Sequence, residues 1–196
     1  KAVALLDEFI SKICSDMMVP VILIPGNHDG AERLRFGSRQ LSSAGLHIIG
    51  DLKQIEEPVI LASPSGDVAF YGIPYNDPET VRNLFDADVT SYDDAHTFLV
   101  DRITAVKNSA KPNVLISHCF IDGAQESESE RPLSIGGADR VSYQPCSAFD
   151  YVALGHLHSP QYKGEKHIRY CGSILKYSFS EQDQNKLLCA SGLDGM

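Results

Sequence analysis

The 196-residue sequence has no basic excess, no C-x-x-C pair and no long apolar run. Its formal net charge of −9 argues against strong binding to DNA by charge alone, although bound divalent cations would reverse the sign locally. The five cysteines are widely spaced, which argues against a thiolate zinc site and favours reduced thiols in a cytoplasmic protein. The longest apolar runs, such as 19–25, are too short to span a bilayer, so no membrane association is expected.

Apolar periodicity predicts a layered α/β fold built around sheets. Helices are expected over 2–17, 32–43 and 92–108. Strands are expected over 19–24, 46–49, 55–61, 67–73, 113–117, 151–154, near 167–170 and over 186–190. The polar stretch 121–148 has little core pattern, and a loop of that length is usually functional or mobile.

Three of the expected strands end in side chains that can bind metal ions. They are followed by Gly26-Asn27-His28-Asp29, by Ser117-His118 and by Gly155-His156-Leu157-His158. Ligand sites in α/β folds lie beyond the carboxyl ends of strands, so the three segments are expected to converge on one crevice.

The chemistry of these side chains suits a pair of transition-metal ions. Imidazole nitrogens and an amide oxygen can hold Mn, Fe or Zn. Two such ions, about 3.5–4 Å apart, can bind a phosphodiester, activate water and stabilise the leaving oxygen. A lone His-x-His pair or a lone His118 is more often structural, but Gly26-Asn27-His28-Asp29 directly after an apolar strand is a much more specific signal.

These segments resemble the third, fourth and fifth motifs of the calcineurin-like metallophosphoesterases. Longer stretches resemble the SbcD exonuclease branch of that family, namely 129–139, 149–161, 168–173 and 176–181. The resemblance implies a layered α/β fold, a metallophosphoesterase β-sandwich flanked by helices, with residues 1–196 forming a partial nuclease domain.

The resemblance also implies roles for individual residues. Asn27, His118 and His156 would ligate one divalent ion and His158 a second, both usually manganese. His28 would be the outer-sphere proton donor to the leaving oxygen, oriented by Asp29. The implied reaction is hydrolysis of DNA phosphodiesters, as exonuclease and endonuclease. The implied partners are DNA, an SbcC-type ATPase subunit and a second copy of the nuclease.

The family's first two motifs, Asp-x-His and Gly-Asp-x-x-Asp, do not occur before Gly26-Asn27-His28-Asp29. We expect them upstream of Lys1, and we expect the C-terminal capping region to be largely absent. Asp51 follows a glycine but stands in the wrong order to substitute. Without these carboxylates the chain is expected to bind metal weakly and to be a poor nuclease alone. Open sheet edges are expected to make it self-associate.

Two other functions fit parts of the sequence. The metal motifs alone would also suit a phosphoesterase for small phosphodiesters or nucleotides, and a catalytically silent scaffold would bind only a partner. Five arginines could contact DNA phosphates, although a solvated surface with local acidic partners is favoured for them: Arg33, Arg35, Arg39, Arg131 and Arg140.

Overall fold

A computed structural model describes residues 1–127, 130 and 139–193. The strands are β1 (Val21–Leu23), β2 (Leu46–Ile48), β3 (Val59–Ser63), β4 (Gly66–Ile73), β5 (Asn113–His118), β6 (Phe120–Ile121), β7 (Arg140–Val141), β8 (Tyr151–Gly155), β9 (Gln161–Lys163) and β10 (Glu165–Tyr170). The helices are α1 (Ala2–Ser11), α2 (Ala31–Leu34), α3 (Ser38–Ser43), α4 (Pro78–Phe85) and α5 (Tyr92–Val106). Short helical turns are η1 (Lys12–Asp16), η2 (Leu52–Gln54), η4 (Gln144–Ala148) and η5 (Phe179–Glu181).

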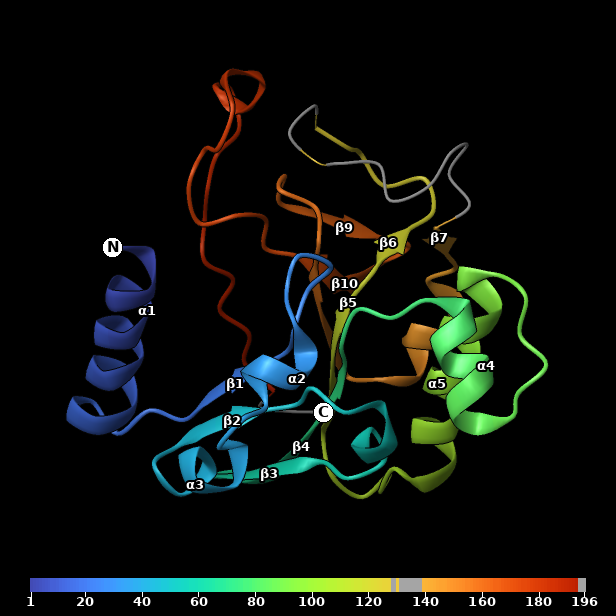
Figure 1. The fold of residues 1–196 in the computed structure, drawn as a ribbon, viewed down its shortest axis with the longest axis horizontal. Helices are drawn as coiled ribbons and strands as arrows, with labels where there is room; N and C mark the ends of the chain where they lie inside the picture. Colours follow the sequence, from blue (N-terminus) through green and yellow to red (C-terminus); the bar gives the residue numbers. More distant parts are fainter. Residues whose placement is uncertain (128–129, 131–138, 194–196) are drawn as a thin grey trace.

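A mixed six-stranded sheet forms the centre of the molecule, in the order β3-β4-β5-β8-β10-β9 (Figure 1). The inner strands β4, β5, β8 and β10 pair in parallel, and the edge strands β3 and β9 are antiparallel to their neighbours. The parallel pairing brings the carboxyl ends of β5 and β8 to one edge, with His118 opposite Gly155.

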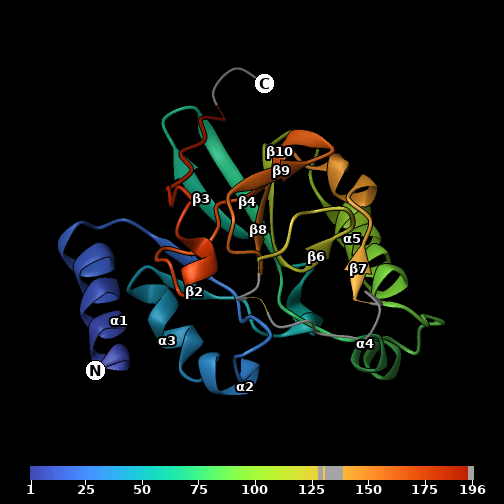
Figure 2. The same cartoon turned by 90° about the horizontal axis from the view of Figure 1, so that it is seen from above.

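The two faces of this sheet are covered differently (Figure 2). Helices α4 and α5 lie on one face, where Leu99 and Ile103 join Leu115 and Val152 in the buried core. The parallel pair β1–β2 lies on the other face with α2 and α3. A Cβ on Gly72 of β4 would lie 2.8 Å from Ile49 Cδ1, so the two layers meet closely there. The predicted layered α/β fold is confirmed.

Several boundaries differ from the sequence prediction for local reasons. The helix expected over 32–43 is two helices, α2 and α3, because Gly37 adopts a φ of 74° between them. The strand expected over 55–61 starts only at Val59, after Pro58, because the apolar Ile55 is buried beside the short turn η2 instead.

One helix was not predicted, and one predicted strand is wrong. The unpredicted helix is α4, which Asp77 caps through a 2.8 Å bond from Thr80 N–H and which has Pro78 in its first turn. The strand expected over 186–190 is wrong, because these residues run without strand pairing past the face of β10. The polar stretch 121–148 contains β7 and η4, and 128–129 and 131–138 lie outside the described residues.

Candidate metal centre

The predicted metal-binding side chains meet in one cavity of about 330 Å³. Asn27 and His28 reach it from the loop after β1, His118 from the end of β5, and His156 and His158 from the segment after β8. The other residues that line it are Glu130, Gly155, Leu157, Gly172 and Ser173. Residues far apart in the sequence therefore converge at the carboxyl ends of three strands, as such folds favour.

Asn27 and His118 are directly joined across this cavity. The amide Oδ1 of Asn27 lies 3.0 Å from Nε2 of His118. Gly26 makes the approach possible, since a Cβ there would lie 2.7 Å from Cε1 of the His118 ring. Two donor atoms that bind one octahedral ion at right angles, each about 2.1 Å away, lie roughly 3 Å apart. The hydrogen-bonded spacing of this pair therefore also suits two ligands of one ion.

His156 approaches the same pair from β8. Its ring centroid lies 5.4 Å from that of His118, and the rings meet edge to face. His156 has a φ of 108°, a conformation that is costly for a residue with a Cβ. Such strain, on the order of 1–3 kcal/mol, is typical of functional sites. The backbone is therefore held in a strained turn that directs this ring into the cavity.

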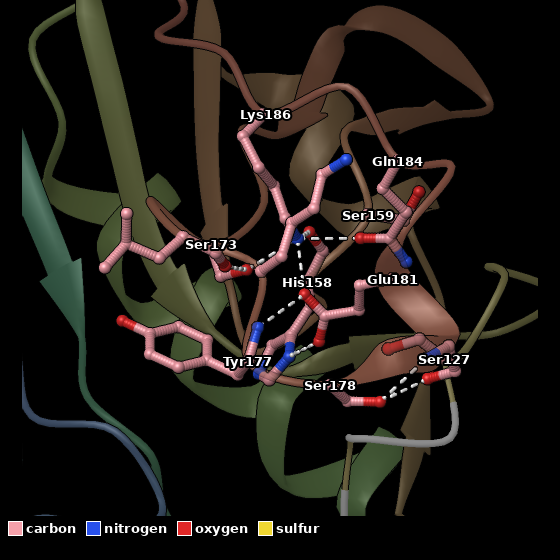
Figure 3. A network of polar contacts seen from close by, with 12 residues as sticks. Ser127, His158, Ser159, Ser173, Tyr177, Ser178, Glu181, Gln184 and Lys186 are labelled. Carbon is pink, nitrogen blue, oxygen red and sulfur yellow. Dashed lines mark hydrogen bonds and ion pairs between the residues drawn. The ribbon is translucent and has the colours of Figure 1, made fainter.

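His158 is held from behind by a buried acid (Figure 3). Its Nδ1 lies 2.8 Å from Oε1 of Glu181, whose side chain has no exposed surface. Lys186 Nζ lies 2.8 Å from the other oxygen of Glu181 and donates to the His158 carbonyl oxygen at 2.8 Å. Glu130 accepts a hydrogen bond from the His158 N–H. With Nδ1 engaged by the carboxylate, Nε2 is the ring nitrogen that would bind a metal ion.

His28 lies at the exposed rim of the cavity, and Asp29 follows it on the same exposed loop. The Oδ2 of Asp29 accepts a 2.8 Å hydrogen bond from Gly26 N–H and so closes the loop that carries Asn27 and His28. The hydrogen bond seen for Asp29 is thus made to the loop backbone, and its predicted orienting action on His28 stays a prediction.

Burial keeps the inner histidines neutral. Desolvation, helped by the neighbouring His156 and His28, lowers the pKa of His118 to about 4, whereas Asp29 opposes the shift. Desolvation also lowers the pKa of His156, against the opposing pull of Glu130 and Asp139. Metal ions bind the neutral imidazole and not the imidazolium ion, so the low pKa leaves both rings available as ligands at neutral pH.

Asn27, His118 and His156 suit a borderline divalent ion, but all three are neutral ligands. Within residues 1–127, 130 and 139–193, no three His, Cys, Asp or Glu side chains gather closely enough to hold a metal ion. The amide oxygen of Asn27 adds a further donor beside His118. An amide oxygen with two imidazoles suits manganese, iron or zinc. Three neutral donors offset little of the cost of dehydrating the ion, so affinity should be low.

The residues that support His158 were not predicted from the sequence. Glu181, Lys186 and Tyr177 come from a segment without core periodicity, although 176–181 matched the family pattern. Asp51 lies away from the cavity, where it pairs with Arg35 and caps η2, as its place in the sequence indicated.

Two of the five arginines considered for phosphate binding pair with nearby acids instead. Arg35 pairs with Asp51, and Arg140 pairs with Asp122 and Glu126. Arg131 lies outside the described residues. A larger cavity, of about 740 Å³, lies between β10 and residues 187–193, and its lining includes none of the predicted site residues.

Comparison with known proteins agrees with this geometry. The sequence model for the calcineurin-like phosphoesterases matches residues 1–160. The chain is 38% identical over 187 residues to the SbcD component of nuclease SbcCD from Staphylococcus epidermidis. That alignment covers 95% of this chain and 49% of the relative, so the chain spans about half the relative's length. The chain belongs to the calcineurin-like phosphoesterase family.

Proposed function

We propose that this cavity is part of a metal-dependent phosphodiesterase centre that hydrolyses DNA. The observation that carries the proposal is the meeting of Asn27, His118 and His156 in one cavity, with His158 beside them. The name of the relative, a component of a nuclease, supports a nucleic acid, and we propose DNA, as the substrate.

Asn27, His118 and His156 would hold one divalent ion and His158 a second, with manganese as the proposed metal. Bound there, the ions would orient the phosphodiester and lower the pKa of an attacking water. The chain contributes neutral imidazoles, since burial lowers the pKa of His118 and of His156. Glu181 fixes the ring of His158, which orients its Nε2.

His28 is the proposed proton donor to the leaving oxygen. Its exposed position at the cavity rim would let it exchange protons with water between turnovers. A solvent-exposed histidine suits general acid catalysis near neutral pH. Asp29 holds the loop closed through Gly26 N–H, which would keep His28 at a fixed height above the cavity.

DNA, an SbcC-type ATPase subunit and a second copy of the chain are the proposed partners. The relative's name places it in an SbcCD nuclease. The exposed apolar face of α1, with Leu5 and Phe9 one turn apart, supports a homodimer. No helix in the described part of the chain is long and apolar enough to cross a membrane.

Manganese titration followed by a DNA assay tests the proposed function. We expect weak Mn²⁺ binding, measured as loss of the electron paramagnetic resonance signal of the free ion. The affinity for Mn²⁺ should be lower still in His118→Ala. Mn²⁺-dependent release of nucleotides from linear duplex DNA should be slow, and His28→Gln should slow it further while leaving Mn²⁺ binding unchanged. Hydrolysis that persists in chelator, or Mn²⁺ binding indifferent to His118, would refute the proposal.

A second candidate is hydrolysis of small phosphodiesters. The cavity of about 330 Å³ lies within the range of small-molecule sites, roughly 300–1,000 Å³, which favours this candidate. Parallel assays with DNA and a chromogenic phosphodiester separate the two. Cleavage of the small ester without any cleavage of DNA would select the second candidate.

A further inference from the structure

The segment that supports His158 also carries an exposed aromatic surface beside the cavity. The Tyr177 ring lies 5.8 Å from the His158 ring, at an interplanar angle of 58°. Tyr177 remains 65% exposed, so the face of its ring that is turned from His158 is open to solvent. Phe179, two residues on, is 95% exposed. Exposed apolar side chains that gather beside a site often mark a binding surface.

Hydrogen bonds to the buried Glu181 and to Lys186 hold residues 173–177 in place. Glu181 accepts a hydrogen bond from Tyr177 N–H at 3.2 Å while it engages His158 and Lys186 (Figure 3). Lys186 also donates to Ser173 Oγ at 2.7 Å, at the start of the same segment. Tyr177 is therefore presented at a fixed place beside His158, with its hydroxyl pointing away from Glu181 in Figure 3.

The charge of the segment differs from that of the whole chain. Residues 172–180 carry one lysine, Lys176, and no Asp or Glu, whereas the chain has a net charge of −9. The one acid beneath, Glu181, is buried and paired with Lys186. Because Gly172 and Ser173 line the cavity itself, the segment leads from the cavity to Tyr177 with Lys176 as its one charged residue. Along residues 172–180 a polyanion would meet no carboxylate of the segment itself, although Glu130 also lines the cavity.

We propose that Tyr177 is a stacking platform for an unpaired nucleobase next to the phosphodiester in the cavity, with Phe179 as a second, outer ring. This inference rests on the proposed function and names its substrate class as DNA with an unstacked or single-stranded terminus. An aromatic ring stabilises a stacked base by about 1–3 kcal/mol whatever the sequence. Stacking would supply affinity that the acidic chain does not gain from phosphate contacts alone.

Binding to oligonucleotides with and without bases tests the platform. The ligands are a fluorescent thymidine dodecamer and the same sugar-phosphate chain lacking bases, measured by anisotropy in Ca²⁺ to suppress cleavage. We expect Tyr177→Ala to weaken binding of the dodecamer about tenfold and Tyr177→Phe to leave it unchanged. Both variants should bind the abasic chain like the wild type. Tyr162→Ala, which removes a half-exposed tyrosine on β9, is the matched control.

The outcomes separate this inference from the function on which it rests. The platform would be overturned if Tyr177→Ala weakened binding of the dodecamer and of the abasic chain equally, or left the affinity for the dodecamer unchanged. It would also be overturned if Tyr177→Phe lost as much affinity as Tyr177→Ala. If Tyr177→Ala binds DNA like the wild type but no longer binds an ATPase partner, the surface is a protein-docking site and the inference fails. If the wild type neither binds nor cleaves DNA, the proposed function fails with it.

Discussion

Nδ1 of His158 lies 2.8 Å from a carboxylate oxygen of Glu181, a side chain with no exposed surface. Lys186, at 2.8 Å from the other oxygen, balances the charge of Glu181. A buried carboxylate is costly unless it is paired, so this trio is stable only as a unit. It fixes the ring of the residue proposed to bind the second ion.

Glu181→Gln should destabilise the fold and disorder His158. The amide cannot balance Lys186, and breaking a buried pair costs about 3–5 kcal/mol, somewhat less here because Lys186 is partly solvated. Urea unfolding measures the loss, and nuclear magnetic resonance of the ring nitrogens reports the tautomer of His158. Glu165→Gln is the control, because Glu165 pairs with His167 at 3.5 Å on the surface. An equal loss of unfolding free energy in both variants would show that the burial of Glu181 does not contribute to stability.

Gly26→Ala should displace His118 from Asn27. The new methyl group would stand 2.7 Å from the His118 ring, which forces the ring or the loop to move. We expect destabilisation of about 1–3 kcal/mol and loss of Mn²⁺ binding. Gly30→Ala is the control, since its nearest neighbour is the flexible Arg33 side chain at 3.5 Å. Unchanged Mn²⁺ binding in Gly26→Ala would contradict the close approach.

Stability should fall as the pH drops from about 6.5 to about 4, partly through His96. Burial lowers the pKa of His96 to about 4, and its Nε2 lies 3.0 Å from Ser117 Oγ. In that interval the unfolded chain binds a proton that the folded chain does not, so acid favours unfolding. His96 accounts for at most about 3 kcal/mol of this loss. His118 acts in the same direction.

His96→Gln isolates that contribution. Glutamine can still hydrogen-bond Ser117 but does not titrate, so the urea stability of this variant should change less between pH 6.5 and 4 than that of the wild type. Identical pH dependence in the two proteins would mean that His96 is protonated without cost in the folded state.

Tyr170→Phe should loosen the segment that follows His118. The buried hydroxyl of Tyr170 accepts from Ile121 N–H at 2.9 Å and donates to the Cys119 carbonyl oxygen at 2.8 Å. Its removal leaves both backbone groups unpaired, at a cost of about 1–3 kcal/mol. Hydrogen exchange at Ile121 and thermal unfolding measure the effect. Tyr162→Phe, on the edge strand β9, should change neither quantity.

Self-association should depend on the apolar face of α1. Leu5→Glu places a charge on an exposed face that includes Phe9, so the sedimentation coefficient should fall toward that of a monomer. Val106→Glu makes the same change on the half-exposed end of α5 and should have no effect. A wild type that stays monomeric at high concentration would remove the homodimer from the proposal.

The sequence alone determined where the candidate ligands converge. Asn27, His118 and His156 each follow an apolar run typical of a buried strand, and parallel strands bring their carboxyl ends to one edge. Local chemistry at Asp77 and Pro78 also encoded the start of α4, although eight residues are too few for a clear apolar period.

The tertiary structure decided what supports those ligands. Glu181 and Lys186 carry no periodic apolar signal, and the contact of each with His158 spans more than twenty residues and forms only in the complete fold. The φ of 108° at His156 follows from the surrounding packing, since no intrinsic preference favours it. Residues 186–190 are apolar enough for a strand but leave the sheet, because a strand needs a partner whose position only the complete fold supplies.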